Sequence, residues 1–296
     1  MPALQVIEAI ATPPRPRARP NSQGPADRGA SAVARERARR VRLVSADEPA
    51  LMALLRTSPI DVAYMLGDLD VPYAEHCRWY AVDDGRLGGV LLHYNGLSMP
   101  TVLTHGSAVD VEALLLATNT DLPRRFYGHF HPEHRAAFEA FFDLGTPRPM
   151  KRMGLARAAY HRQGDFAEVE PLTHRDTGAI MRLYQHYPDN FFEPAQLDTG
   201  LYFGIRDGDD LISVAGIHVL SERHDIAAIG NIVTHSGHRG RGLATRCVGR
   251  LLDALFQKVG AVALNVQEGN EPAIRCYRKF GFADRYDFWE GVAQAR

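Results

Sequence analysis

The chain lacks several features that would place it in a specialised class of protein. It has only three cysteines among 296 residues, Cys77, Cys247 and Cys276, and no two of them have a metal-binding spacing. An odd, scattered set of this kind favours free thiols in a reducing compartment over disulfides or zinc. No apolar run approaches the roughly 18 residues that cross a bilayer, and the N-terminus has no compact apolar segment with a cleavage site. We therefore expect a cytoplasmic protein with no membrane segment and no metal.

A strong charge of either sign is also missing. The chain has 34 Lys and Arg against 35 Asp and Glu, a formal net charge of −1. A balance this close gives no support for a polyanionic partner such as a nucleic acid. Apolar residues, in contrast, make up 45% of the chain, which is enough for the cores of two ordinary domains.

Residues 1–40 differ from the rest of the chain. They are rich in Arg, Pro, Ala and Gly and poor in aromatic residues, so they cannot bury enough apolar surface to order themselves. We predict a disordered arm over this range. A transit peptide and a nucleic-acid-binding tail are the alternatives, because the arm is rich in arginine, but its proline density argues against the amphipathic helix of a transit peptide.

The residues after the arm begin with a helix and a hairpin. Residues 46–69 are predicted to be helical, with Ser45 as the N-cap. Residues 78–94 place two β-prone runs on either side of Asp84-Gly85, which is the chemistry of a tight turn.

The second half of the chain repeats this order. A helix is predicted from residue 177 and a hairpin over residues 201–220. In both halves an apolar strand, a Thr-His turn and an apolar helix follow, as "TVLTHGSAVDVEALLLAT" and as "NIVTHSGHRGRGLATRCVGRLLDAL". We predict two similar domains in tandem, over 41–162 and 166–296, each with a mixed sheet flanked by helices.

The two halves differ at the turn that precedes the apolar helix. Gly240 and Gly242 remove side chains where a helix of the second half begins, and a bare helix start lets a phosphate approach the unpaired N–H groups. Arg239, Arg241 and Arg246 add attraction for an anion. The first half has one glycine and two acidic residues there.

Two common phosphate-binding patterns do not fit this turn. A dinucleotide fingerprint from Gly240 would need Gly or Ala where the chain has Thr245. A P-loop from Gly237 would need Lys followed by Ser or Thr where the chain has Leu243-Ala244. The ligand is therefore a phosphate compound of another kind, or the turn is only a soft connection with solvated arginines.

Two motifs in order resemble the GCN5-related N-acetyltransferase (GNAT) superfamily. "RGRGLA", Arg239 to Ala244, resembles its Arg/Gln-x-x-Gly-x-Gly/Ala signature, and "NVQEGNEPAIRCYRKFGF" resembles its next motif. Proline often precedes the first motif, where this chain has Ser236-Gly237-His238. The resemblance implies an α/β (α+β) fold of tandem GNAT-like domains, each with a mixed, mostly antiparallel central sheet. It also implies a first half without a cofactor motif and a second half that binds acetyl-CoA as cosubstrate.

The resemblance also implies roles for individual residues of the second half. The splayed central strand would bind the thioester carbonyl and pantetheine amides, the turn would hold the pyrophosphate, and a side chain on the next loop would reach the pantetheine. The residues that match these roles are, in order, Ile232 and Val233; Arg239, Gly240, Arg241, Gly242, Leu243 and Ala244; and Asn270. Asn270 can equally be only a helix N-cap. Tyr277 resembles the general acid that protonates the departing thiolate, and its alternative is a core tyrosine.

The implied reaction is direct attack of a neutral amine on the thioester. A base must take up the amine's proton, and the candidates His218, Glu222, Glu193 and His235 cannot be ranked from the sequence. Four aromatic residues could wall the acceptor site: Phe191, Phe192, Tyr202 and Phe203. The acceptor can be a small amine or a peptide amine. A non-catalytic acyl-CoA-binding regulator and, with less support, a nucleic-acid-binding module are the alternative functions.

Overall fold

The computed structural model describes residues 30–185, 187 and 190–296. The first half contains α1 (Ala32–Ala38), β1 (Val41–Val44), α2 (Pro49–Leu55), α3 (Ala63–Gly67), η2 (Tyr73–His76), β2 (Cys77–Asp83), β3 (Leu87–Tyr94), β4 (Thr101–His105), α4 (Ala108–Thr118), β5 (Arg125–Phe130), α5 (Arg135–Glu139), β6 (Phe142–Asp143), β7 (Arg148–Ala156) and η3 (Arg157–Ala159). The second half contains β8 (Glu170–Pro171), η4 (His174–Asp176), α6 (Thr177–Tyr184), η5 (Pro194–Thr199), β9 (Phe203–Asp207), β10 (Asp210–Ser221), β11 (Ile226–Thr234), η6 (Ser236–His238), α7 (Leu243–Leu255), β12 (Ala261–Gln267), α8 (Glu271–Lys279) and β13 (Ala283–Ala295).

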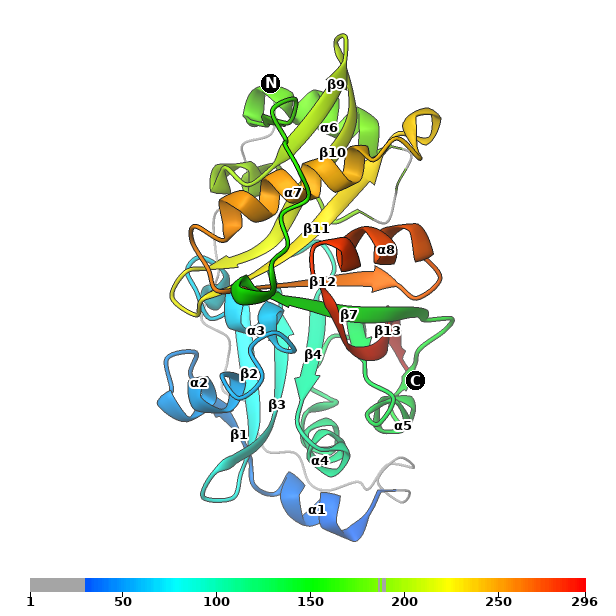
Figure 1. Ribbon diagram of the computed structural model, residues 1–296. Helices are drawn as coiled ribbons and strands as arrows, with labels where there is room; N and C mark the ends of the chain where they lie inside the picture. Colours follow the sequence, from blue (N-terminus) through cyan, green and yellow to red (C-terminus); the bar gives the residue numbers. More distant parts are fainter. Residues whose placement is uncertain (1–29, 186, 188–189) are drawn as a thin grey trace, which may run out of the picture.

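The strands of the described residues form one continuous mixed sheet. Its order is β1-β2-β3-β4-β5-β13-β7-β12-β11-β10-β9-β8, and β6 pairs with β13 beside this path. The two strands at the centre are exchanged between the halves: β7 pairs with β12, and β13 pairs with β5, both antiparallel. In Figure 1, β12, β7 and β13 cross the middle of the molecule between the two halves. Each half therefore completes the sheet of the other.

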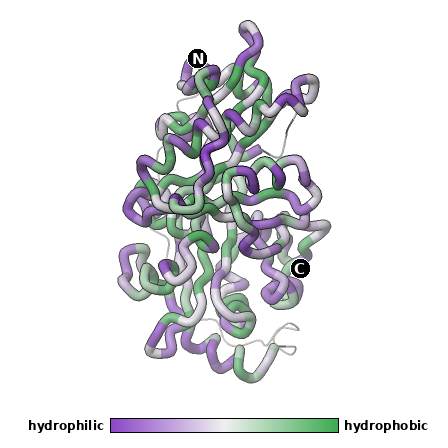
Figure 2. Tube along the Cα trace, viewed as in Figure 1, coloured by the Kyte–Doolittle hydropathy of each residue, from purple (hydrophilic) through white to green (hydrophobic). Residues whose placement is uncertain are grey.

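The hydrophobic cores follow this exchange. The core of the second half takes Met153 and Leu155 from β7, and the core of the first half takes Ala293 from β13. A third core packs α2 and α3 onto residues of both halves, including Val219 and Ile226. Figure 2 shows mostly hydrophobic colour along the central strands and mostly hydrophilic colour on the outer turns. Because the cores are shared, we expect the halves to depend on each other for stability.

Most predicted elements are confirmed. Both hairpins form, β2 with β3 and β9 with β10, and the helices α4, α6, α7 and α8 lie where the apolar periodicity places them. A mixed sheet flanked by helices, repeated in tandem, is the predicted fold class. The exchange of β7 and β13 was not predicted, because a division of the chain at residues 162–166 assigns each strand to its own half.

Two local predictions are wrong. Residues 32–38, inside the predicted disordered arm, form α1; Ser31 caps this helix, and Arg37 forms an ion pair with the buried Asp110 of α4. Residues 1–29 of that arm lie outside the described residues. The predicted helix over residues 46–69 is two short helices, because Pro59 lies between α2 and α3 and proline lacks the N–H that continues a helix.

Two further properties concern the described part of the chain alone. None of its helices combines the length and the apolar character that crossing a membrane requires. Within the same residues, no group of three His, Cys, Asp or Glu side chains is arranged to hold a metal ion.

Candidate active site

The first feature of the site is an opening in the sheet between β11 and β12. These parallel strands pair only from Ile226 to Ile229, so residues 230–234 have no partner on β12. The backbone changes direction there, because Asn231 has a φ of 53° and the pairing of β11 with β10 is irregular. Ile232 and Val233 lie on this stretch. An unpaired strand edge offers backbone N–H and C=O groups to a ligand, as the predicted thioester and amide contacts require.

The second feature is the turn that leads from β11 into α7. Gly240 and Gly242 have φ values of 78° and 77°, in the region that glycine adopts without strain, and Gly242 is the N-cap of α7. No side chain caps this helix, and its first turn contains no acidic residue. A Cβ at either glycine would meet no atom within 4 Å. The turn is thus open, with free N–H groups at a positive helix end, and it fits a pyrophosphate.

The arginines of the turn have different surroundings. Arg239 is exposed, and its Nη2 donates to the hydroxyl of Tyr187 at 2.8 Å. Arg241 is exposed next to His238. Arg246, in contrast, forms an ion pair with Glu168 at 2.5 Å. We therefore expect Arg239 and Arg241 to attract an anion, and Arg246 to hold α7 against the segment just before β8.

The remaining residues of the turn contribute through their backbone. Leu243 is 3% exposed and packs into the second-half core, while Ala244 is half-buried in the first turn of α7. Their side chains fix the helix, which leaves their N–H groups as the parts that a phosphate could contact.

The helix α8 carries the two other predicted residues. Asn270 is its N-cap, and the side-chain Oδ1 accepts from the N–H of Ala273 at 3.3 Å, so the capping role is confirmed. Its Nδ2 has no partner among the described residues, and the predicted contact with pantetheine uses that group. Cys276 faces Thr245 of α7 at 3.2 Å, which agrees with a packing role for this thiol.

Tyr277 lies in the core of the second half and is 6% exposed. Burial raises the pKa of its phenol well above the ordinary value, so the hydroxyl keeps its proton at neutral pH. Within the described residues this hydroxyl has no hydrogen-bond partner. The ring therefore packs in the core, as the structural alternative predicts, while the general-acid role of Tyr277 stays a prediction.

The four candidate bases lie in different places. Glu222 pairs with the exposed Lys258, Glu193 belongs to the capping box of η5, and His235 accepts from the N–H of Gly237. His218 differs from these three because it lies on β10 at the junction of the halves. Burial lowers the pKa of His218 to about 4, so it is a neutral hydrogen-bond acceptor at neutral pH.

The four aromatic candidates for the acceptor wall also differ in their surroundings. Tyr202 and Phe203 are 0% and 3% exposed, and Phe192 packs against their core, so these three are structural. Phe191 is 41% exposed and contacts Tyr127 of the first half. Sequence reasoning missed Tyr127 because it belongs to the half without a cofactor motif. It also gave no role to Asn231, although Asn is one of the few residues that tolerate a positive φ.

The first half carries the counterpart of this site, and its own side chains fill it. Ser107 caps α4, its hydroxyl donates to Asp110 at 2.6 Å, and Asp110 in turn pairs with Arg37. β4 and β5 also part after two paired residues, but there the buried His134 bridges the opening by hydrogen bonds to Thr104 at 3.1 Å and to a backbone carbonyl.

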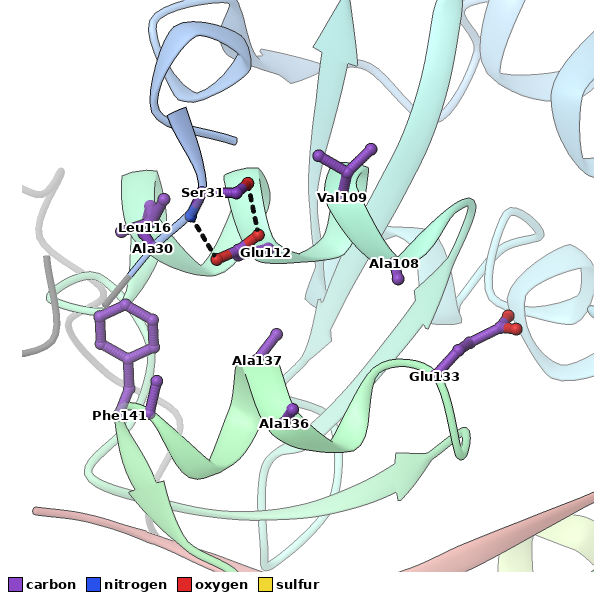
Figure 3. Close-up of a pocket in the computed structure, with 11 residues that line it drawn as sticks. Ala30, Ser31, Ala108, Val109, Glu112, Leu116, Glu133, Ala136, Ala137 and Phe141 are labelled. Atoms are coloured by element: carbon purple, nitrogen blue, oxygen red, sulfur yellow. Dashed lines mark hydrogen bonds between the residues drawn. The ribbon is translucent and has the colours of Figure 1, made fainter. Parts of the chain in front are cut away.

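A cavity of about 450 Å³ lies between α4 and α5, next to this filled turn. Five of its eleven lining residues are alanines, and Figure 3 shows that Glu112 is hydrogen-bonded to Ser31 on one side. Glu133 stands at the other end of the cavity. Two carboxylates and a capped helix start disfavour an anionic ligand, so this cavity does not reproduce the open turn of the second half.

The comparisons with known proteins agree with this geometry. Residues 166–282 match the model of the Acetyltransferase (GNAT) family. Residues 166–282 therefore belong to the GNAT superfamily. The chain is similar to the N-alpha-acetyltransferase RimI of Mycobacterium tuberculosis, with 34% identity over 85 residues, which are 27% of this chain and 51% of that protein. It is also similar to an uncharacterized protein of Mycobacterium leprae, with 39% identity over 101 residues, which are 32% of this chain and 28% of that protein.

The arrangement of both halves also has a counterpart among solved structures. A tandem GNAT protein from the clavulanic acid biosynthesis pathway has a TM-score of 0.51 and 16% identity, over 86% of this chain and 98% of that one. At this identity the likeness shows the two-domain fold alone. The chain spans 28% and 51% of the lengths of the two curated relatives. Their similarity therefore does not establish the activity or the substrate of this chain.

Proposed function

We propose that the protein is an acyl-CoA-dependent N-acetyltransferase whose second half binds acetyl-CoA and transfers its acetyl group to an amine. The observation that carries this proposal is the uncapped start of α7 at Gly242, directly after the stretch of β11 that has left β12. When bound, acetyl-CoA would supply an activated thioester. The turn from Arg239 to Ala244 would hold its pyrophosphate, and the free edge at Ile232 and Val233 would bind its carbonyl and amides.

The reaction needs three further contributions from the chain. The free strand edge polarises the carbonyl, which favours attack by the amine nitrogen. The opening in the sheet holds the reacting groups together, so the attack becomes effectively intramolecular. Tyr277 keeps a proton that it can give to the departing sulfur, because burial raises the pKa of its phenol.

The test is release of free thiol from acetyl-CoA in the presence of a panel of amines, combined with calorimetric binding of acetyl-CoA alone. We expect saturable binding and amine-dependent thiol release. Binding without turnover of any amine would indicate an acyl-CoA-binding regulator, and absence of binding would refute the proposal. Strongly salt-dependent binding of DNA or RNA in place of acetyl-CoA would support the nucleic-acid alternative.

A further inference from the structure

Five aromatic side chains from both halves form a closed ring at the junction of the molecule. Going around the ring, the centroid distances are 5.4 Å from Tyr127 to Phe191, 6.3 Å to His218, 6.1 Å to Tyr64, 5.9 Å to His129 and 6.3 Å back to Tyr127. Neighbouring rings meet at 59–85°, as adjoining walls of a box do. We call these five residues the aromatic box.

The aromatic box differs from the aromatic clusters of the cores. Phe126, Phe130 and Phe138 also contact one another, but each is 0% exposed. All the box residues keep accessible surface, and Phe191 is 41% exposed. Ligand sites are lined mainly by apolar and aromatic side chains, so a ring of aromatic side chains that remains partly exposed is a candidate binding site.

The box stands beside the opening between β11 and β12. The ring of His218 covers Gly230, the residue before the stretch that has no partner on β12, and a Cβ at Gly230 would clash with it. Asn231, the next residue, accepts from the N–H of Phe191 at 3.0 Å. One wall of the box is therefore tied to the strand that would hold the thioester.

The box also lies on the face of the sheet away from α7 and α8. In β11, Ala227 and Ile229 belong to the core that holds these helices, whereas Ile226 and Ala228 belong to the core that holds α3. Alternate residues of a strand point to opposite faces, so α3, which carries Tyr64, covers the other face. An acceptor in the box would meet the thioester from the side opposite the proposed cofactor.

A buried carboxylate supports two of the walls. Glu290 of β13 accepts from the hydroxyl of Tyr127 at 2.8 Å and from Nδ2 of Asn265 at 2.9 Å, and its Oε1 lies 3.2 Å from Nε2 of His129. Although burial alone would raise it, His129, Tyr127 and the nearby Arg148 hold the pKa of Glu290 at about 2. The carboxylate thus stays ionised and keeps Tyr127 and His129 in place.

The charges near the box decide which acceptor it fits. Arg148 donates to the hydroxyl of Tyr127 at 3.1 Å, and the guanidinium of Arg152 stacks on Tyr64 at 4.9 Å. Both cations lie near Glu290, and burial raises the pKa of Asp68, the C-cap of α3, to about 7. Aromatic faces attract cations, so the rings alone would not exclude a polycation, but the guanidinium groups of Arg148 and Arg152 beside the box disfavour additional positive charge. The rings offer apolar contact to the body of the acceptor.

We propose that the aromatic box binds the acceptor and that the acceptor is a primary amine carried on an apolar or aromatic group. This inference rests on the proposed acetyltransferase activity. The rings remove the amine from water, which favours the neutral form that attacks the thioester, and the nearby guanidinium groups act in the same direction. His218 is the wall nearest the opening, and its neutral imidazole can accept a hydrogen bond from the amine nitrogen.

The experiment compares phenethylamine, spermidine and glycine as acceptors in the thiol-release assay, with the wild type, Phe191→Ala and Tyr127→Leu. We expect phenethylamine to have the highest kcat/KM. Either substitution should raise its KM about ten-fold or more, because a ring that contacts the acceptor is lost. Met181→Ala, which removes an apolar side chain 55% exposed on α6, is the matched control and should leave KM unchanged. Melting curves check that each variant folds.

Two outcomes would overturn this inference while the proposed function stands. One is an unchanged KM for phenethylamine in both box variants, and the other is a higher kcat/KM for spermidine or glycine. Calorimetry with acetyl-CoA alone tests the proposed function separately, since neither box variant touches the turn at Gly242. If acetyl-CoA binds but no amine turns over, phenethylamine is titrated into the chain saturated with an unreactive thioether analogue of acetyl-CoA. Absence of binding there would also overturn the inference.

Discussion

The turn before α7 and the turn before α4 occupy the same place in the two halves, yet one is open and the other is filled. Before α7 the chain has two glycines with positive φ and no cap. Before α4 it has a serine cap, an acidic residue in the first turn and an arginine from α1 that neutralises this acid. The comparison indicates that a helix start can bind an anion when its first N–H groups have no hydrogen-bond partner in the chain. When a side chain caps these N–H groups, the helix start has a structural role only.

The same contrast extends to the helices that follow. Tyr277 comes seven residues after Asn270, the cap of α8, and Phe141 comes seven residues after His134, the cap of α5. The first half thus has a ring at this position but no hydroxyl. The first half contributes to the structure through α3, β5 and β7, which complete the sheet and the junction of the second half.

The largest expected effect comes from making the second half resemble the first at this position. Tyr277→Phe keeps the ring and its packing but removes the proton donor, so turnover should fall about 100-fold to 10,000-fold. Acetyl-CoA affinity and the melting temperature should change little. Single-turnover kinetics with acetyl-CoA and an accepted amine provide the measurement.

Tyr160→Phe is the matched control for this substitution. The hydroxyl of Tyr160 donates to Asp253 at 2.8 Å, away from the opening in the sheet, so its loss should not slow turnover. Undiminished turnover in Tyr277→Phe would make Tyr277 a core residue only.

The next effect concerns the open turn itself. Gly242→Leu places a side chain at the start of α7, where we expect the pyrophosphate to approach, and should raise the Kd of acetyl-CoA more than about 100-fold through loss of two or more charge-assisted hydrogen bonds. Because Gly242 has a φ of 77°, the substitution also strains the backbone. Gly208→Leu, at a φ of 59° in the β9–β10 turn, imposes a similar strain elsewhere and should leave the Kd unchanged. Equal affinities in the two variants would contradict the assignment of the turn.

How much of this could be predicted from the sequence depends on the range of the interaction. The glycines at 240 and 242, the cap at Asn270 and the hairpin turns are local, and their conformations follow from a few neighbouring residues. The helix α1 was missed because its partners, Asp110 and Glu112, lie about eighty residues away and outweigh the composition of the arm. The periodicity of a sequence indicates a strand but not which other strand it pairs with. It therefore could not predict the exchange of β7 and β13.

The candidate site divides in the same way. The cofactor side lies within one stretch of about fifty residues, which a motif can indicate. The aromatic box takes residues from α3, β5, β10 and the loop before η5, which only the exchanged sheet brings together. No local signal in the sequence connects Tyr64 with His218.

A smaller effect is expected from opening the filled turn. Asp110→Ala removes the partner of Arg37 and of the Ser107 hydroxyl, which should lower the free energy of unfolding by about 1–3 kcal/mol. Acetyl-CoA affinity should not change, because α4 keeps Ser107 as its cap and gains no glycine. Denaturant unfolding and calorimetry measure the two quantities. Asp84→Ala, which removes an exposed ion pair with Arg40, is the control and should cost at most about 1 kcal/mol.

The central claim, that only the second half has a cofactor site, is tested most directly by the stoichiometry of acetyl-CoA binding. Calorimetric titration of the full chain should saturate at one acetyl-CoA per chain, and Gly242→Leu should abolish that single event. Saturation at two per chain, or one event that survives Gly242→Leu unchanged, would mean that the first half binds the cofactor despite its capped turn, and would contradict the account.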